Sequence, residues 1–345
     1  MNDTSNNWVT LLGTSDRRAG TSSTRTTRPD ELLWRVTLPD SIRSSPVLRD
    51  GVVYVTCRDG HLYALESRTG RERWKFQAAG ALHSTPSCSD DLVLFGSDDG
   101  AVYAVDRTSG QLRWKTEAGG AIWTSPTVSD GSVYFGSTNG TFTAADRRSG
   151  QVRWTRQFEG QIHSTAYAGP LIYFGCSDGR LYALDAPSGK DAWMHQTGDG
   201  VTGAPALVDG MLLAGSEDHF FYALDAASGK LRWRFETQLG ISASPAAADG
   251  KVFVASKDGR VYALGAADGA EIWKTTSIRT ITAAPVAGPA AVCIQGFYGA
   301  TKAYDVTTGK ELWTANLGGS LQSTPILTDE AVYLATYAGV VYALR

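Results

Sequence analysis

The sequence predicts an all-β chain that closes into an eight-bladed β-propeller of four-stranded antiparallel blades, the last blade being closed by the N-terminal strand. Two observations support this. Asp-Gly or Asn-Gly pairs, which supply the positive φ of two-residue hairpins, recur through the chain, for example at 59–60 and 99–100. Tryptophans recur with them at intervals of 40, 40, 40, 39, 40, 40 and 40 residues, a period typical of repeat folds, at Trp34, Trp74, Trp114, Trp154, Trp193, Trp233, Trp273 and Trp313.

Each repeat divides into four strands. The first starts at an S-x-P element, such as 44–46, and an Asp-Gly turn leads to an alternating apolar strand, such as 52–57. A second tight turn precedes a Y-A-L-D strand, and an S/T-G turn leads to the tryptophan strand. Short strands separated by turn residues, without a helical period, indicate hairpins throughout the chain.

The two ends of the chain are predicted to share one blade. The last unit, 323–345, stops after three strands, whereas the first tryptophan strand, near 31–38, precedes any complete unit. Pairing them completes an eighth blade and removes exposed strand edges. We therefore expect a propeller over 31–345, preceded by a flexible leader over 1–30 that is rich in Ser, Thr, Asn and Arg.

Composition and charge narrow the function classes. The formal charge of -3 and pI near 6.0 argue against a nucleic-acid or anionic-membrane binder, which needs a basic face. The sequence contains no run of about 18 apolar residues and no signal-peptide pattern, so it predicts a cytoplasmic protein, which we expect to be a monomer. The four cysteines lie far apart and predict buried, reduced thiols, with no metal site.

One position per repeat changes its chemistry and is predicted to face the central funnel. It lies nine residues after each tryptophan, next to the S-x-P strand, and its flanking residues stay apolar or small. We place this position at the face that also carries the turn before Y-A-L-D, named the top face. The occupants of the position, in chain order, are Arg43, His83, Trp123, His163, Thr202, Ser242, Thr282 and Gln322.

A second variable position lies sixteen residues before each tryptophan, in the other top-face turn. His219 follows it where the other units have glycine, which predicts an uncommon positive φ. Two turns depart from the Asp-Gly pattern and add aromatic bulk on adjacent blades: one contains Phe297 and Tyr298, and the other contains Tyr337. The candidate ligand-binding residues from this turn are Arg58, Asp98, Glu217, His219, Lys257, Phe297, Tyr298 and Tyr337, beside Trp123 and Gln322 of the funnel.

Each funnel residue allows two interpretations. His83 and His163 are candidate general acid and base, because imidazole titrates near neutrality, or they form a structural pair bonded to water. Arg43 either stabilises a developing anion or is a solvated cation. Trp123 is either a stacking platform or a plug that closes the axis.

The A-x-D-x-x-S/T-G-x-x-x-W segment, seen in 223–233 and 303–313, resembles the tryptophan-docking motif of the pyrroloquinoline-quinone-like propeller family. That family includes quinoprotein alcohol dehydrogenases and the barrel-assembly outer-membrane lipoprotein. The resemblance covers roughly 31–345 and implies that each tryptophan packs between neighbouring blades. It also implies, in the dehydrogenases, a quinone held by adjacent cysteines with calcium ligands in long insertions, and, in the lipoprotein, a signal peptide with an acylated cysteine. This sequence lacks all of these features, so we expect no cofactor.

Three functions are open on this basis. The first is a non-catalytic scaffold that binds a protein or peptide, or a small-molecule ligand, through its top face and funnel. The second is a small-molecule biosynthetic enzyme that uses the Arg, His, Trp and His cluster for acid-base chemistry. The third is a quinone-dependent oxidoreductase, which the missing cofactor features disfavour. The fold alone does not decide between them.

Overall fold

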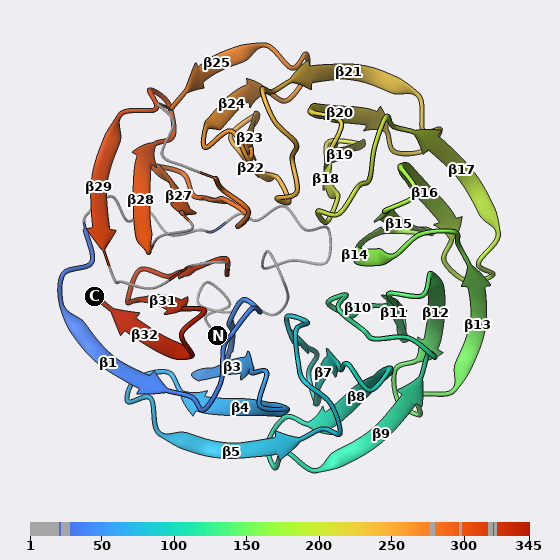
Figure 1. The fold of residues 1–345 in the computed structure, drawn as a ribbon, viewed down its shortest axis with the longest axis vertical. Helices are drawn as coiled ribbons and strands as arrows, with labels where there is room; N and C mark the ends of the chain where they lie inside the picture. The colour runs from blue at the N-terminus through green and yellow to red at the C-terminus, as the bar shows by residue number, and fades with distance from the viewer. Residues whose placement is uncertain (1–20, 22–27, 276–279, 297–298, 317–319, 321–322) are drawn as a thin grey trace.

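The described part of the chain consists of 32 strands and no helix. The computed structural model describes residues 21, 28–275, 280–296, 299–316, 320 and 323–345, with the backbone alone at 164 and 166–168. The strands form eight separate four-stranded sheets, which are arranged as blades around a central axis (Figure 1). The predicted all-β, eight-bladed propeller is confirmed.

Seven blades are built from consecutive strands that run from the inside to the outside of the ring. Blade 1 contains β2 (Val47–Arg49), β3 (Val52–Thr56), β4 (His61–Glu66) and β5 (Glu72–Gln77). Blade 2 contains β6 (Ser87–Cys88), β7 (Leu92–Gly96), β8 (Ala101–Asp106) and β9 (Leu112–Glu117). Blade 3 contains β10 (Thr127–Ser129), β11 (Ser132–Gly136), β12 (Thr141–Asp146) and β13 (Val152–Gln157). Blade 4 contains β14 (Ile162–Ala168), β15 (Leu171–Cys176), β16 (Arg180–Asp185) and β17 (Asp191–Gln196).

The same order continues through the second half of the ring. Blade 5 contains β18 (Ala206–Val208), β19 (Met211–Gly215), β20 (Phe220–Asp225) and β21 (Leu231–Glu236). Blade 6 contains β22 (Ala246–Ala248), β23 (Lys251–Ala255), β24 (Val261–Gly265) and β25 (Glu271–Lys274). Blade 7 contains β26 (Val286–Ala287), β27 (Ala291–Gln295), β28 (Ala300–Asp305) and β29 (Glu311–Asn316).

Blade 8 joins the two ends of the chain, as the repeat register predicts. Its inner strands are β30 (Ile326–Leu327), β31 (Val332–Ala335) and β32 (Val340–Leu344), and its outer strand is β1 (Leu32–Thr37). β1 pairs antiparallel with β32, and Figure 1 shows this blue strand lying beside the red one. The pairing closes the ring with hydrogen bonds between segments that lie roughly 300 residues apart in sequence.

Tryptophans of the outer strands fasten each blade to the next. Trp114, for example, is 7% exposed, and its indole nitrogen donates to Arg147 O of the following blade at 2.9 Å. Six further tryptophans make the corresponding bond, and their acceptors are the backbone oxygens of Ser67, Arg107, Ala186, Ala226, Ala266 and Val306. These bonds confirm the structural role of the tryptophans. Trp313 is the exception: its Nε1 is buried and has no partner among the described residues.

The aspartates that end the Y-A-L-D strands organise the turns that follow. The carboxylate of Asp106 accepts hydrogen bonds from the backbone N–H groups of Thr108 and Ser109 and from the guanidinium of Arg113 at 2.6 Å. The bond from Arg113 is the largest of the effects that hold the pKa of Asp106 well below its usual range. The carboxylate of Asp106 is thus engaged within its own blade.

The loops between blades and the turns between second and third strands share the top face. The remaining two turns of each blade lie on the opposite face, named the bottom face. All four cysteines are buried, and none of them forms a disulfide. The described residues contain no helix long and apolar enough to cross a membrane.

Candidate functional site

The variable funnel residues lie together around one cavity on the top face, where the inner strands approach the axis. The cavity has a volume of about 180 Å³. Its rim is made by the seven described residues of the series, namely Arg43, His83, Trp123, His163, Thr202, Ser242 and Thr282. Gln322, the eighth, lies outside the described residues.

The local sequence explains why these side chains face the axis. The residue before each of them is a large aliphatic one, and Ile42, Leu82 and Ile122 are at most 1% exposed. Neighbouring residues in extended chain point to opposite sides, so each buried aliphatic side chain directs the next side chain into the funnel. A second layer of small residues, including Ser45, Thr85 and Thr324, lines the cavity below the rim.

Bonds between blades strengthen this lower layer. The backbone N–H of Ser45 donates to Thr85 Oγ1 of the next blade at 3.0 Å, and Thr324 N–H donates to Ser45 Oγ at 2.8 Å across the closure. Ala204 N–H donates to Ser244 Oγ in the same way. The floor of the funnel is therefore a rigid ring on which the rim residues are mounted.

Asp98 connects two of the rim residues. Its carboxylate accepts a hydrogen bond from Trp123 Nε1 at 2.8 Å, and its other oxygen lies 3.1 Å from His83 Nε2. Asp98 is not among the residues lining the cavity. The residue predicted to bind a ligand therefore positions two others, a role that repeat spacing alone did not reveal.

The imidazoles lie on either side of Trp123. The ring centroids of His83 and His163 are 5.8 Å and 6.1 Å from that of Trp123. Burial lowers the pKa of both histidines; at His83 the charge of Asp98 opposes this effect, while Arg43 adds to it. Both rings therefore favour the neutral form at neutral pH, and each of them contacts the indole of Trp123.

Arg43 and Tyr337 meet at the seam between blades 1 and 8. Arg43 Nη2 donates to Tyr337 Oη at 3.3 Å, and the guanidinium carbon lies 5.5 Å from the centre of the phenol ring. The two residues are 294 positions apart in sequence, and ring closure brings them together.

The other top-turn candidates stand outside the cavity. Lys257 Nζ binds both carboxylate oxygens of Glu217 at 2.7 and 2.8 Å, so these two charges offset each other. His219 has the predicted positive φ, 76°, and is exposed in the β19–β20 turn. Arg58 lies in the β3–β4 turn and does not line the cavity. Phe297 and Tyr298 lie outside the described residues.

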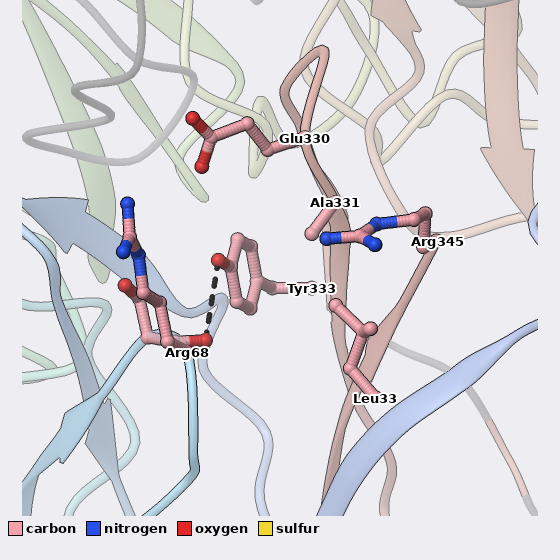
Figure 2. A pocket seen from close by; sticks show the side chains of 7 residues that line it. Leu33, Arg68, Glu330, Ala331, Tyr333 and Arg345 are labelled. Atoms are coloured by element: carbon pink, nitrogen blue, oxygen red, sulfur yellow. Dashed lines mark hydrogen bonds between the residues drawn. The ribbon is translucent and has the colours of Figure 1, made fainter.

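A second cavity, missed by the sequence reasoning, lies on the bottom face beside the joined blade. It has a volume of about 430 Å³ and is lined by Leu33, Ser67, Arg68, Glu330, Ala331, Tyr333 and Arg345. Figure 2 shows the phenol of Tyr333 between these side chains, with its hydroxyl donating to Ser67 O. In blade 2, three residues form the turn that joins Asp106 to Gly110. In blade 8, Arg345 and Asp30 occupy the corresponding positions, and no turn joins them. This gap in the repeat was the signal that could have revealed the cavity.

The described residues contain no group of three or more His, Cys, Asp or Glu side chains placed to hold a metal ion. The top-face site thus consists of one cation, two neutral imidazoles, one indole and an arc of hydroxyls. It can donate and accept hydrogen bonds and offer an aromatic surface.

Comparisons with known proteins give a family and a fold. The family model described as "Outer membrane protein assembly factor BamB" matches residues 19–193 and 164–345. No curated protein matches the chain. Among solved structures, BamB from Moraxella catarrhalis is 19% identical with a TM-score of 0.80, over 91% of this chain and 99% of that one.

Two dehydrogenases also share the fold. The quinohemoprotein alcohol dehydrogenase ADHIIG from Pseudomonas putida HK5 is 16% identical with a TM-score of 0.85, over 99% of this chain and 80% of that one. A europium-containing methanol dehydrogenase is 14% identical with a TM-score of 0.86, over 98% of each chain. Because the family model covers nearly the whole chain, this protein belongs to the pyrroloquinoline-quinone-like propeller repeat family of the outer membrane protein assembly factor BamB.

Proposed function

We propose that this protein is a non-catalytic binding module that captures a peptide segment of a partner protein on its top face. The exposure and fixed position of the Trp123 side chain are the observation that carries the proposal. Its side chain is 40% exposed although it lines the cavity and is fixed by Asp98 and flanked by two imidazoles. Exposed aromatic residues held in place before binding are typical anchors of protein interfaces.

The size of the funnel supports a side chain as its occupant. Pockets for drug-sized ligands and cofactors usually enclose about 300–1,000 Å³, whereas this cavity measures about 180 Å³. One or two side chains of a docked peptide would fill it. The small, bonded residues beneath the rim leave no room for deeper insertion without breaking contacts between blades.

The family supports the same class of function. The matched family model is named for an assembly factor, and a scaffold that holds another polypeptide is consistent with that description. The outer-membrane role in that name belongs to the assembly factor and forms no part of the proposal. We also propose, from the sequence features alone, that the protein is located in the cytoplasm.

Acid-base catalysis on a small molecule is the second candidate, and one contact favours it. The carboxylate of Asp98 lies 3.1 Å from His83 Nε2, and a carboxylate that orients an imidazole is common in catalytic sites. The contacts of both His83 and His163 with the indole of Trp123 argue against a concerted acid-base pair, because the indole occupies the space next to each imidazole. Substitution of both histidines by glutamine separates the alternatives, since peptide capture on Trp123 would be weakened only in part, whereas turnover would be lost.

The test is selection of peptides from a displayed library on the intact protein, followed by calorimetric titration of the enriched sequences. Trp123→Ala should weaken their binding by about thirtyfold, the loss expected at an interface hot spot of about 2 kcal/mol. Leu239→Ala is the matched control, because Leu239 is 48% exposed in another top-face loop outside the cavity. Enrichment of no peptide, or equal losses in both variants, would contradict the proposal.

A further inference from the structure

The seam between blades 1 and 8 gathers hydrogen-bond donors at one side of the funnel mouth. Arg43 comes from the β1–β2 loop, Arg58 from the β3–β4 turn and Tyr337 from the β31–β32 turn. The bond between Arg43 and Tyr337 is 3.3 Å long. Both arginines lower the pKa of Tyr337, with the hydrogen bond from Arg43 as the largest cause, so the phenol lies in the field of both guanidinium groups.

Neither Arg43 nor Arg58 forms an ion pair with a carboxylate among the described residues. Arg43 donates to the neutral hydroxyl of Tyr337, and Arg58 Nε is buried without a hydrogen-bond partner among the described residues. Asp40 is a nearby carboxylate that accepts the backbone N–H of Ser41 at 2.6 Å; this bond is the largest cause that lowers the pKa of Asp40, and the charge of Arg58 adds to it without direct contact.

The opposite side of the mouth is different. There Lys257 is held by both oxygens of Glu217, and the rim residues Thr202, Ser242 and Thr282 carry no charge. Asp98, the acid on blade 2, is engaged by Trp123 and His83. The field across the funnel therefore points from the seam of blades 1 and 8 toward a neutral arc.

We propose that Arg43, Arg58 and Tyr337 form an oxyanion subsite that takes a carboxylate or phosphate group of the bound ligand. Guanidinium groups carry five donors in a planar fork and bind such groups through paired, charge-assisted hydrogen bonds. Arg43 also lines the cavity that holds Trp123, so the ligand would set its anionic group on the seam and its apolar part against the indole. The role of the subsite in partner capture rests on the proposed function, whereas its binding of a free oxyanion does not depend on that function.

The experiment follows the Nε–Hε NMR signals of arginine in the full-length protein during titration with sodium acetate, sodium phosphate and, as a reference for ionic strength, sodium chloride. The signals of Arg43 and Arg58 should shift and saturate with acetate or phosphate. Arg43→Gln and Arg58→Gln should each weaken binding about tenfold, as loss of a charge-assisted bond of about 1.5 kcal/mol predicts, and Tyr337→Phe should weaken it by a smaller factor. Arg148→Gln, which removes an exposed arginine of the bottom face, should change nothing.

The outcomes are distinct. Tighter binding of acetate indicates a carboxylate such as an acidic peptide side chain, tighter binding of phosphate indicates a phosphoryl group, and both support the subsite. Shifts that chloride reproduces at equal ionic strength, or that Arg43→Gln and Arg58→Gln leave intact, overturn it. If no peptide depends on Trp123 but acetate still gives a saturating shift of the Arg43 signal, the proposed function fails while the subsite stands. If a peptide depends on Trp123 but neither acetate nor phosphate shifts the arginine signals, the subsite fails while the proposed function stands.

Discussion

The indole of Trp74 on blade 1 packs against the backbone of Gly110 on blade 2, so closely that a β-carbon on Gly110 would lie 2.6 Å from the ring. Gly110 also has a φ of 71°, a value that L-residues with side chains rarely adopt. The glycine of the motif is therefore required twice, by its own backbone and by the tryptophan of the preceding blade. The same contact recurs around the ring, for example between Trp34 and Gly70.

Gly110→Ala should lower the free energy of unfolding by about 2–5 kcal/mol, the sum of left-handed strain and overpacking. Gly210→Ala is the control, because Gly210 has a φ of 76° but no atom within 4 Å of the point where a methyl group would lie. It should cost only the strain, about 1–2 kcal/mol. Equal losses in urea denaturation would show that the indole contact contributes nothing.

The indole nitrogen of Trp313, which has no acceptor among the described residues, gives a second comparison. Trp114 and Trp313 are almost equally buried, at 7% and 6% exposed, but of the two only Trp114 has an acceptor among the described residues, Arg147 O. Trp114→Phe should therefore destabilise the protein by about 1 kcal/mol more than Trp313→Phe, the net worth of one buried hydrogen bond. The measurement is the urea midpoint of each variant, and a larger loss in Trp313→Phe would refute the assignment.

Stability should fall as the pH is lowered from about 7.5 to about 5.5, the range around the ordinary pKa of histidine. Burial holds the folded-state pKa of His83 and His163 below the usual value, so in this window the unfolded chain binds more protons than the folded one, and acid favours unfolding. Melting temperatures of the wild type and of His83→Gln/His163→Gln across this range test the claim. The slope should be smaller in the double variant but not zero, because the pKa of His195 is also lowered by burial.

Removal of the Asp98 charge should affect the two funnel histidines differently. Asp98 raises the pKa of His83 against the effect of burial, whereas burial is the cause acting on His163. Asp98→Asn should therefore lower the pKa of His83 further and leave that of His163 in place. An NMR titration of both imidazoles checks this, and a common shift would mean that the variant has disturbed the funnel as a whole.

The sequence predicted the blades, the ring closure and the positions of the seven described rim residues, because each follows from a fixed spacing. Once the tryptophan period is known, Arg43 and His163 occupy one position of one repeat, and their orientation follows from the buried aliphatic residue before them. Spacing does not reveal contacts between different positions of neighbouring blades. The bridge from Asp98 to Trp123 and the meeting of Arg43 with Tyr337 depend on side-chain reach, which only coordinates supply.

The top-turn candidates show the same limit. Variation at that position indicated side chains that the repeat does not require, but it did not tell that the described ones stand outside the cavity. Glu217 and Lys257 pair with each other across adjacent blades. For Phe297 and Tyr298 the prediction stays untested.

The pairing of β1 with β32 has a consequence for the time course of synthesis. Leu32 leaves the ribosome early and finds its partner, Leu344, only after roughly 300 further residues have been added, which takes roughly 15–60 s at the usual rate of translation. Throughout that interval seven blades can stack in order while the first strand waits without an edge to join. The propeller is therefore an open arc during most of its synthesis, and the ring closes only when β1 docks onto β32.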